Sequence, residues 1–396
     1  MFRQTVAALA VLIAGALPIA VHAAPAQPPI FGAYYPGGSA ERYPVSSIPA
    51  ERLTHLFYAF STIEDGRCTI GAEAPKNFAA LAELKKAHPH LRTLISIGGW
   101  GAGGFSDAAL TEASRKRLVD SCMALFFDRH AGSFDGVDID WEFPVSGGPK
   151  ELAHRPQDRA NLTRLAQAFR VALDAHGRKA GQPMLLTAAL AAGRLQTDGP
   201  YDPAASYDLP ALAKVFDFIN LMSYDMGTGF SAVSTFNAPL HEVPTDPLAP
   251  ELRRWNNVAG AVQYYRERGV PAHKLVLGVP FYGRGFKVTG DAPDGLYQSY
   301  SAPADAGDWR VIKARYLDQP GWTKHWQPQA QSPWLYNAEQ KVFISYEDPR
   351  SIGLRAQFAR EQGLAGVFMW ELTGDDEQAS LLNAMLGPWQ KARIGD

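Results

Sequence analysis

Three acidic residues, Asp138, Asp140 and Glu142, occupy alternate positions of the apolar segment 136–143. Side chains alternate between the two faces of a β-strand, so these carboxyl groups would project to one side and Trp141 to the other. Successive carboxyls would lie about 6–7 Å apart, where one ionised group raises the pKa of its neighbour in a partly dry pocket. Such a row can keep one carboxylic acid protonated near neutral pH. The alternative is that the three acids have no catalytic role and form a salt-bridged acidic rim. Stability alone does not favour that arrangement, because burying adjacent acids costs desolvation energy and brings like charges together.

The elements around these acids predict a parallel barrel. Short apolar runs alternate with amphipathic stretches, which is the order of βαβ units. Eight runs have strand character: residues 30–35, 53–60, 91–97, 136–143, 184–190, 216–223, 275–280 and 366–370. Helical candidates with apolar residues at three- and four-residue spacing are 77–87, 107–129, 157–175 and 253–268. The predicted fold class is α/β, a (β/α)8 TIM barrel, in which active sites lie at the C-terminal ends of the strands.

One connection is longer than a crossover helix requires. Residues 285–350, between the seventh and eighth predicted strands, are rich in Tyr, Trp, Gly and Pro and contain strand-like pieces such as 341–346. We expect a small α+β insertion there, forming one wall of a cleft. The predicted organisation is one barrel domain over residues 27–396 with this insertion inside it. The sequence shows no repeat or linker that would mark an appended module.

Residues 135–142, Asp-Gly-Val-Asp-Ile-Asp-Trp-Glu, resemble the DGxDxDxE signature of glycosyl hydrolase family 18, the chitinases and their relatives. Other strand ends are similar to further motifs of that family in the expected order. Residues 96–100 (Ser-Ile-Gly-Gly-Trp) resemble SxGG, residues 221–225 (Leu-Met-Ser-Tyr-Asp) resemble MxYD, and residues 277–286 resemble the stretch before the family's insertion. The resemblance implies a chitinase that hydrolyses β-1,4 linkages between N-acetylglucosamine units in chitin and chitooligosaccharides, with no cofactor and no metal.

The resemblance also implies a retaining mechanism in which the substrate supplies the nucleophile. Glu142 would be the general acid and then the general base, while the carbonyl oxygen of the sugar's 2-acetamido group attacks the anomeric carbon. Asp140 would hold the acetamido N–H and share a proton with Asp138. Tyr224 would donate its hydroxyl to the acetamido oxygen. Ser96 is expected to bond Asp138 from behind.

Further side chains at the strand ends are candidates for contact with sugar. Sugar rings stack on aromatic faces, and Trp370, at the end of the last strand, is expected to form the floor of the central subsite. The candidates for flanking subsites are Trp100, Tyr282, Arg284 and Trp255. The candidates for the central pocket are Tyr34, Met222 and Asp225.

Two alternatives use the same barrel. A non-catalytic chitin-binding lectin has lost the acid, which is present here as Glu142. An endoglycosidase acting on another N-acetylglucosamine linkage would often lack the insertion.

A zinc or nucleotide enzyme is not supported, because the sequence contains no His/Cys cluster and no phosphate-binding glycine loop. The net charge of -2 gives no field that would gather nucleic acid, so an uncharged polymer is the easier partner.

The N-terminus predicts an exported protein. Met1 precedes an apolar run over residues 6–21 and then several alanines, which is the pattern of a signal peptide, assigned here to residues 1–23. We expect a secreted protein, extracellular or periplasmic, which has no membrane contact after cleavage and is a monomer. An oxidising destination permits a disulfide between Cys68 and Cys122, and the sequence leaves this pairing open.

Overall fold

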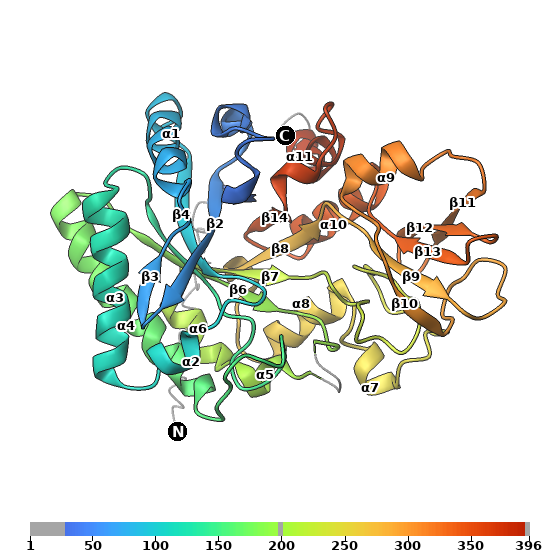
Figure 1. Ribbon diagram of the computed structural model, residues 1–396, viewed down its shortest axis with the longest axis horizontal. Coiled ribbons are helices and arrows are strands. Elements are labelled where there is room, and N and C mark those ends of the chain that lie inside the picture. The colour runs from blue at the N-terminus through green and yellow to red at the C-terminus, as the bar shows by residue number, and fades with distance from the viewer. Residues whose placement is uncertain (1–27, 197–200, 393–396) are drawn as a thin grey trace, which may run out of the picture.

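A computed structural model describes residues 28–196 and 201–392 of the 396-residue chain, so the predicted signal peptide, residues 1–23, lies outside the described residues. Eight parallel strands close into a barrel (Figure 1): β1 (Ile30–Pro36), β2 (His55–Glu64), β4 (Arg92–Gly98), β5 (Gly136–Asp140), β6 (Leu185–Ala191), β7 (Phe218–Met222), β8 (Leu275–Pro280) and β14 (Gly366–Trp370). β1 pairs with both β2 and β14, which closes the ring. The predicted (β/α)8 fold is confirmed.

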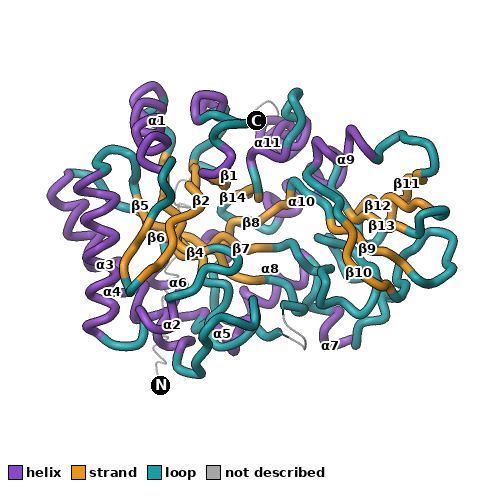
Figure 2. Tube along the Cα trace, viewed as in Figure 1, coloured by secondary structure: helices purple, strands orange, loops and turns teal. Residues whose placement is uncertain are grey.

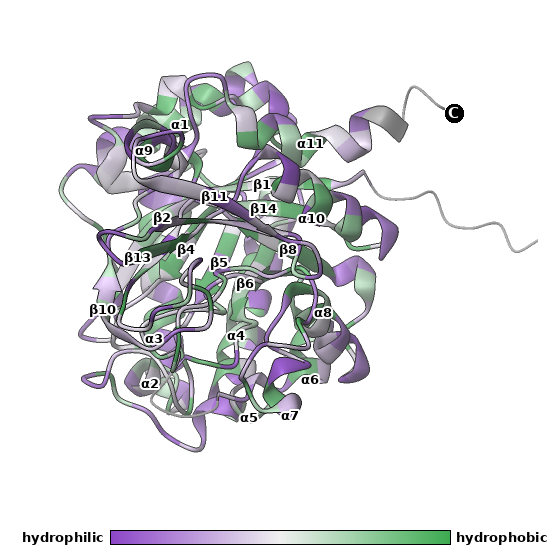
Figure 3. Ribbon diagram, turned by 90° about the vertical axis from the view of Figure 1, so that its right-hand side faces the viewer, coloured by the Kyte–Doolittle hydropathy of each residue, from purple (hydrophilic) through white to green (hydrophobic). Residues whose placement is uncertain are grey.

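Helices surround the strands (Figure 2). The longer ones are α1 (Ala74–Ala87), α3 (Glu112–Met123), α4 (Asp158–Ala180), α8 (Val258–Glu267), α10 (Pro349–Glu361) and α11 (Ser380–Ala392). In α4, Leu165, Phe169 and Leu173 recur every four residues and are fully buried, so this helix presents one apolar stripe to the core. Figure 3 shows hydrophobic stretches along the central strands and mixed hydropathy on the outer helices. No helix of the described ranges is long and apolar enough to cross a membrane.

Polar capping residues divide two of the predicted helices. The segment predicted as one helix over residues 107–129 consists of α2 (Phe105–Ala108), α3 and the π-helical turn η4 (Ala124–Arg129). Thr111 restarts the helix, because its Oγ1 accepts a hydrogen bond from the Ser114 amide at 3.0 Å and the Thr111 amide donates to Ser114 Oγ. Asn257 likewise begins α8, after the separate turn α7 (Pro250–Arg253). The predicted helices over residues 107–129 and 253–268 were therefore wrong at their N-terminal parts.

A short hairpin was missed by the sequence analysis. β2 continues beyond its predicted end and pairs antiparallel with β3 (Arg67–Thr69). Cys68 on β3 is disulfide-bonded to Cys122 on α3, with 5.1 Å between the two Cα atoms. The pairing that the sequence left open is therefore present in the structure, and it ties the hairpin to the helix that follows the next barrel strand.

The chain between β8 and β14 builds a second sheet beside the barrel (Figure 1). Its elements are β9 (Arg284–Val288), β10 (Tyr300–Ala304), α9 (Trp309–Arg315), β11 (Trp322–Gln327), β12 (Ser332–Asn337) and β13 (Val342–Ser345). The five strands are antiparallel in the order β10-β9-β13-β12-β11. We call residues 284–345 the insertion. Its small apolar core includes Phe286 and Trp334 and is joined by Phe236 from the loop after β7, so barrel and insertion share a hydrophobic contact.

Candidate active site

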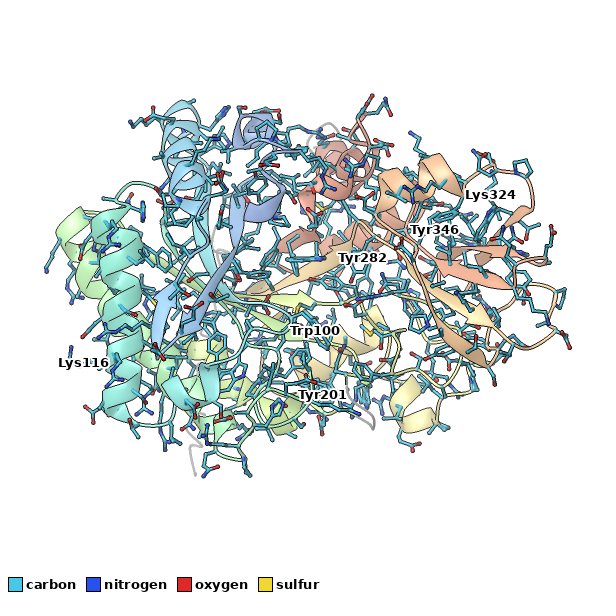
Figure 4. The ribbon with its side chains drawn as sticks, viewed as in Figure 1. Trp100, Lys116, Tyr201, Tyr282, Lys324 and Tyr346 are labelled. Carbon is cyan, nitrogen blue, oxygen red and sulfur yellow. A yellow bond between two sulfur atoms is a disulfide. The ribbon has the colours of Figure 1, made fainter. Side chains whose placement is uncertain are left out.

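A cleft of about 490 Å³ opens at the C-terminal ends of the barrel strands. Of the residues singled out from the sequence, it is lined by Tyr34, Trp100, Asp140, Glu142, Met222, Tyr224, Asp225, Tyr282, Arg284 and Trp370. The sequence analysis missed six further lining residues: Phe60, Ala189, Gln196, Thr228, Gly229 and Phe230. Trp100 and Tyr282 both lie in the central part of the view, between the helices on the left and the insertion on the right (Figure 4).

Asp138 is fully buried at the centre of the barrel. Its Oδ2 accepts hydrogen bonds from the hydroxyls of Tyr34, at 2.8 Å, and Ser96, at 2.7 Å. Its Oδ1 accepts from Thr187 Oγ1 at 2.6 Å and from Asn220 Nδ2 at 3.4 Å. Burial raises the pKa of Asp138, and these donors oppose that rise because they stabilise the ionised form. Ser96 bonds Asp138 as expected; it is completely buried and does not line the cleft.

Asp140 is the next acid along β5 and does line the cleft. Burial raises its pKa well above the usual value, and the charges of Glu142 and Asp138 raise it further. Its Oδ1 is buried and has no hydrogen-bond partner within the described residues. A buried acceptor without a donor costs about 1–3 kcal/mol, and this cost is smaller when the carboxyl is protonated, in line with the raised pKa. Gly98 beside it has φ +118°, and a Cβ there would clash with the Asp140 carbonyl oxygen.

Glu142 lies beyond the end of β5, which stops at Asp140, so the predicted strand over residues 136–143 was too long. The chain turns at Trp141, whose ring stacks on Phe105 of α2 with 5.1 Å between centroids. Glu142 is half-buried at the wall of the cleft. Burial raises its pKa to about 8 and the charge of Asp225 adds to this rise, while Arg284 opposes it. Glu142 is therefore a protonated acid at neutral pH.

Asp225, directly after the tyrosine at the end of β7, is held from the insertion side. Its Oδ1 accepts from the Tyr282 hydroxyl at 2.8 Å and from Arg284 Nε at 2.7 Å. Its backbone has a φ of 56°, in the left-handed region, and its amide donates to Asn237 Oδ1 at 2.9 Å. The first strand of the insertion thus supplies a cation that fixes an acid of the barrel rim.

Tyr224 comes from the end of β7, and its ring packs edge-on against Tyr282, with 6.2 Å between centroids. It lines the cleft, and no hydrogen bond of its hydroxyl occurs within the described residues. Burial, followed by the neighbouring tyrosine and the acids around it, raises the pKa of Tyr224 well above 10. The hydroxyl therefore remains a proton-bearing donor that can reach a bound ligand.

Aromatic rings form the floor and rim of the cleft. Trp370 stacks on Phe60 with 5.6 Å between centroids and 22° between planes. Trp100 is 55% exposed at the rim. Trp255, in contrast, packs against Tyr264 and lies outside the cleft lining, so its role in a flanking subsite stays a prediction. The periodicity of the sequence gave no means of separating this tryptophan from those at the strand ends.

The fold and the site together define a class of protein. A barrel whose C-terminal rim carries one protonated carboxyl, two further buried acids and stacked aromatic rings has the groups that a glycosidase needs. Within residues 28–196 and 201–392, no group of three or more His, Cys, Asp or Glu side chains is arranged to hold a metal ion.

Comparisons with known proteins give the family. The family model described as glycosyl hydrolases family 18 matches residues 31–375, and the chain belongs to this family. It is 35% identical to Chitinase A1 of Niallia circulans, over 86% of this chain and 56% of that protein. The chain spans little more than half the length of the curated relatives that it matches first.

Solved structures are similar over most of this chain. A glycoside hydrolase family 18 N-acetylglucosaminidase from Paenibacillus barengoltzii is 31% identical, with a TM-score of 0.80, and the match covers 91% of this chain and 100% of that one. Chitinase ChiA74 from Bacillus thuringiensis is 30% identical, with a TM-score of 0.82, covering 91% of this chain and 70% of that one. The barrel is therefore a member of a family in which solved examples have closely similar folds.

Proposed function

We propose that this protein is a chitinase that hydrolyses β-1,4 linkages between N-acetylglucosamine units of chitin and chitooligosaccharides. The observation that carries the proposal is the position of Glu142 in the cleft lining together with Asp140, Tyr224 and Trp370, where burial raises the pKa of the Glu142 carboxyl to about 8. Membership of glycosyl hydrolase family 18 and the likeness to Chitinase A1 support it. The wall that the insertion adds to the cleft through Arg284, next to Tyr282, supports a linear polymer as substrate.

In the first step, Glu142 donates its proton to the glycosidic oxygen, and the bond between that oxygen and the anomeric carbon breaks. The carbonyl oxygen of the substrate's own acetamido group bonds to the anomeric carbon and forms a cyclic oxazolinium ion. Tyr224 donates its hydroxyl to the acetamido oxygen and holds the group in attack geometry. Asp140 accepts the acetamido N–H through its carboxylate, and its negative charge offsets the positive charge of the ion.

In the second step, the carboxylate of Glu142 takes a proton from water while the water oxygen bonds to the anomeric carbon. The bond from the anomeric carbon to the acetamido oxygen breaks, and the product keeps the configuration of the substrate. Asp138 stays beneath Asp140 and shares a proton with it, because two adjacent buried carboxyls resist simultaneous ionisation. The sugar in the centre of the cleft stacks on Trp370, and Met222 packs against the acetamido methyl.

We expect Glu142→Gln to abolish hydrolysis of defined N-acetylglucosamine oligomers while binding persists, because the amide keeps the size of the side chain but has no acidic proton to transfer. General acid–base catalysis contributes about 10²–10⁴-fold, so the loss in kcat is at least of that order. A product time course with anomer analysis measures turnover and retention together, and calorimetry measures binding. Glu112→Gln, at an exposed position of α3, is the matched control.

Any of three results would overturn the proposal. Unchanged turnover in Glu142→Gln would remove the catalytic assignment, and absence of turnover in the natural chain would favour the chitin-binding lectin. A measured preference for N-glycans over chitin oligomers would instead favour the endoglycosidase. The same time course, run on both substrates, separates these outcomes.

We also propose that the protein is exported and acts outside the cytoplasm as a monomer, with residues 1–23 removed and one catalytic domain over residues 27–396 that contains the segment 285–350. The charged and apolar pattern of the N-terminus supports export. Mass determination of the protein recovered from culture medium or periplasm tests the cleavage, and light scattering tests the monomer. Recovery of the uncleaved chain from the cytoplasm would contradict export.

A further inference from the structure

A small recess opens from the cleft next to Glu142. Its volume is about 30 Å³, close to the share of liquid volume that one water molecule occupies. Beyond the residues of the main cleft, it is bordered by Phe143 and Ala191. We call it the side recess. It lies on the flank of the catalytic acid and is bordered by Trp100, so it is on the Trp100 side of the cleft.

Gln196 contributes a neutral amide to the side recess, where the other polar side chains are acids, a tyrosine and an indole. It is 6% exposed, and the loop that carries it is tied down at two points. Its Nε2 donates to the Asp225 carbonyl oxygen at 3.3 Å, and its own carbonyl oxygen accepts from the Gly148 amide at 3.1 Å. No hydrogen bond to its Oε1 occurs within the described residues, so this oxygen can accept one from a small molecule.

The chemistry places the incoming acceptor on this flank. The group that protonates the leaving oxygen must later deprotonate the acceptor, so by microscopic reversibility the acceptor takes the place that the leaving group vacates beside Glu142. A water molecule there has two protons to place. Glu142 takes one as the oxygen attacks, and the second needs a hydrogen-bond acceptor that does not compete as a base.

We propose that Gln196 is a positioning residue for the attacking water: its Oε1 accepts one water proton while the Glu142 carboxylate removes the other. The water oxygen bonds to the anomeric carbon, the anomeric bond to the acetamido oxygen breaks, and the second proton stays on the product hydroxyl. This inference rests on the proposed function. It adds a residue that selects the acceptor after the intermediate has formed.

Partition of the intermediate between water and methanol tests the inference. Hydrolysis and methanolysis of an N-acetylglucosamine tetramer share every step up to the oxazolinium ion, so the ratio of methyl glycoside to free sugar reports only the acceptor step. A change that merely lowers the fraction of folded enzyme does not move this ratio. In Gln196→Met, which keeps the length but loses the oxygen, we expect the ratio to rise about fivefold, the effect of one lost neutral hydrogen bond.

Two variants and a control make the result decisive. Gln196→Asn, which keeps the amide but withdraws its oxygen by one methylene, should also raise the ratio. Glu112→Gln, at the exposed position of α3 used as a control above, lies outside the cleft and the side recess and should leave the ratio unchanged. A ratio in both Gln196→Met and Gln196→Asn equal to that of the natural chain overturns the inference. Failure of the natural chain to cleave the tetramer overturns the proposed function instead.

Discussion

The three carboxyl groups of β5 and its continuation differ in what surrounds them. Asp138 has four hydrogen-bond donors, Asp140 has two neighbouring acids and an oxygen without a donor, and Glu142 is half-buried with a charged neighbour from another strand. The same type of side chain therefore has three electrostatic settings within one short segment. Asp140 and Glu142 both line the cleft and both have a raised pKa, but Asp140 is buried, whereas Glu142 is half-buried at the cleft wall.

The pH dependence of turnover should follow Glu142. Its pKa of about 8 means that kcat/KM falls as the pH rises through this value, because the acid form is lost. Asp225→Asn removes a negative charge that raises the pKa of Glu142. It also releases Arg284 from its ion pair, and the charge of Arg284 lowers that pKa. Both effects should move the basic limb of the pH profile to lower pH. Profiles of kcat/KM against pH measure the shift. Asp128→Asn, exposed on η4, is the control, and a limb that stays in place or moves upward contradicts the assignment.

Sequence reasoning found the residues that belong to motifs and missed those that only the closed barrel brings together. Thr187 and Asn220 stand alone in apolar strands, and nothing in their spacing marks them as donors to Asp138. Gln196 and Asn237 lie in loops without periodicity. Their contacts depend on how distant strands are placed, which a local pattern does not encode. A polar residue inside an otherwise buried strand is the one signal that could have identified the first two.

Among the elements, the β2–β3 hairpin had a usable signal that the sequence analysis passed over. Asp65 and Gly66 form a two-residue connection in which both have positive φ, 49° and 69°. An Asp-Gly pair between strand-like segments is typical of such a turn. The positions of the barrel strands, in contrast, were predicted closely, because a run of buried apolar residues between amphipathic helices has few other folds available to it.

The disulfide that joins this hairpin to α3 should stabilise the fold. Cys68 and Cys122 are 54 residues apart, and closing a loop of that length restricts the unfolded chain by about 4 kcal/mol in the chain-entropy treatment. We expect the double variant Cys68→Ser/Cys122→Ser to lower the free energy of unfolding by about 2–4 kcal/mol. Denaturant unfolding with and without reductant measures this, since reductant should affect the natural chain and not the variant. Equal stability of the natural chain and the double variant without reductant would contradict the expectation.

At the scale of the whole molecule, one buried cation joins the insertion to the barrel. Arg355 of α10 is fully buried and forms an ion pair with Glu347, 3.0 Å from Nη1 to Oε2. It donates to Ser332 Oγ on β12 at 2.8 Å and to the carbonyl oxygens of Gln331 and Ala238. These partners belong to the insertion and to the loop after β7, so a single guanidinium connects three parts of the chain.

Removing this cation should destabilise the whole protein. Arg355→Met leaves a buried carboxyl without its partner, which costs about 3–5 kcal/mol in comparable cases. Burial raises the pKa of Glu347 to about 7. The loss of stability should therefore be smaller at pH 6, where the carboxyl is already protonated, than at pH 8, where it must either ionise without a partner or stay protonated at a cost. The double variant Arg355→Met/Glu347→Leu should regain part of the stability. Urea unfolding measures the free energy of unfolding of the natural chain, the single variant and the double variant, and exposed Arg360→Met is the control. Equal losses of stability in Arg355→Met and Arg360→Met would contradict the prediction.

Asp138 places a boundary on how such a protein can change during evolution. It joins side chains from β1, β4, β6 and β7 by hydrogen bonds, so its replacement would disturb the interior on which the barrel depends. Glu142 has no comparable bonds in the described part of the chain, and losing its acid would leave the interior intact. Loss of the Glu142 carboxyl would therefore leave the folded barrel and its cleft in place, whereas loss of Asp138 would disturb both.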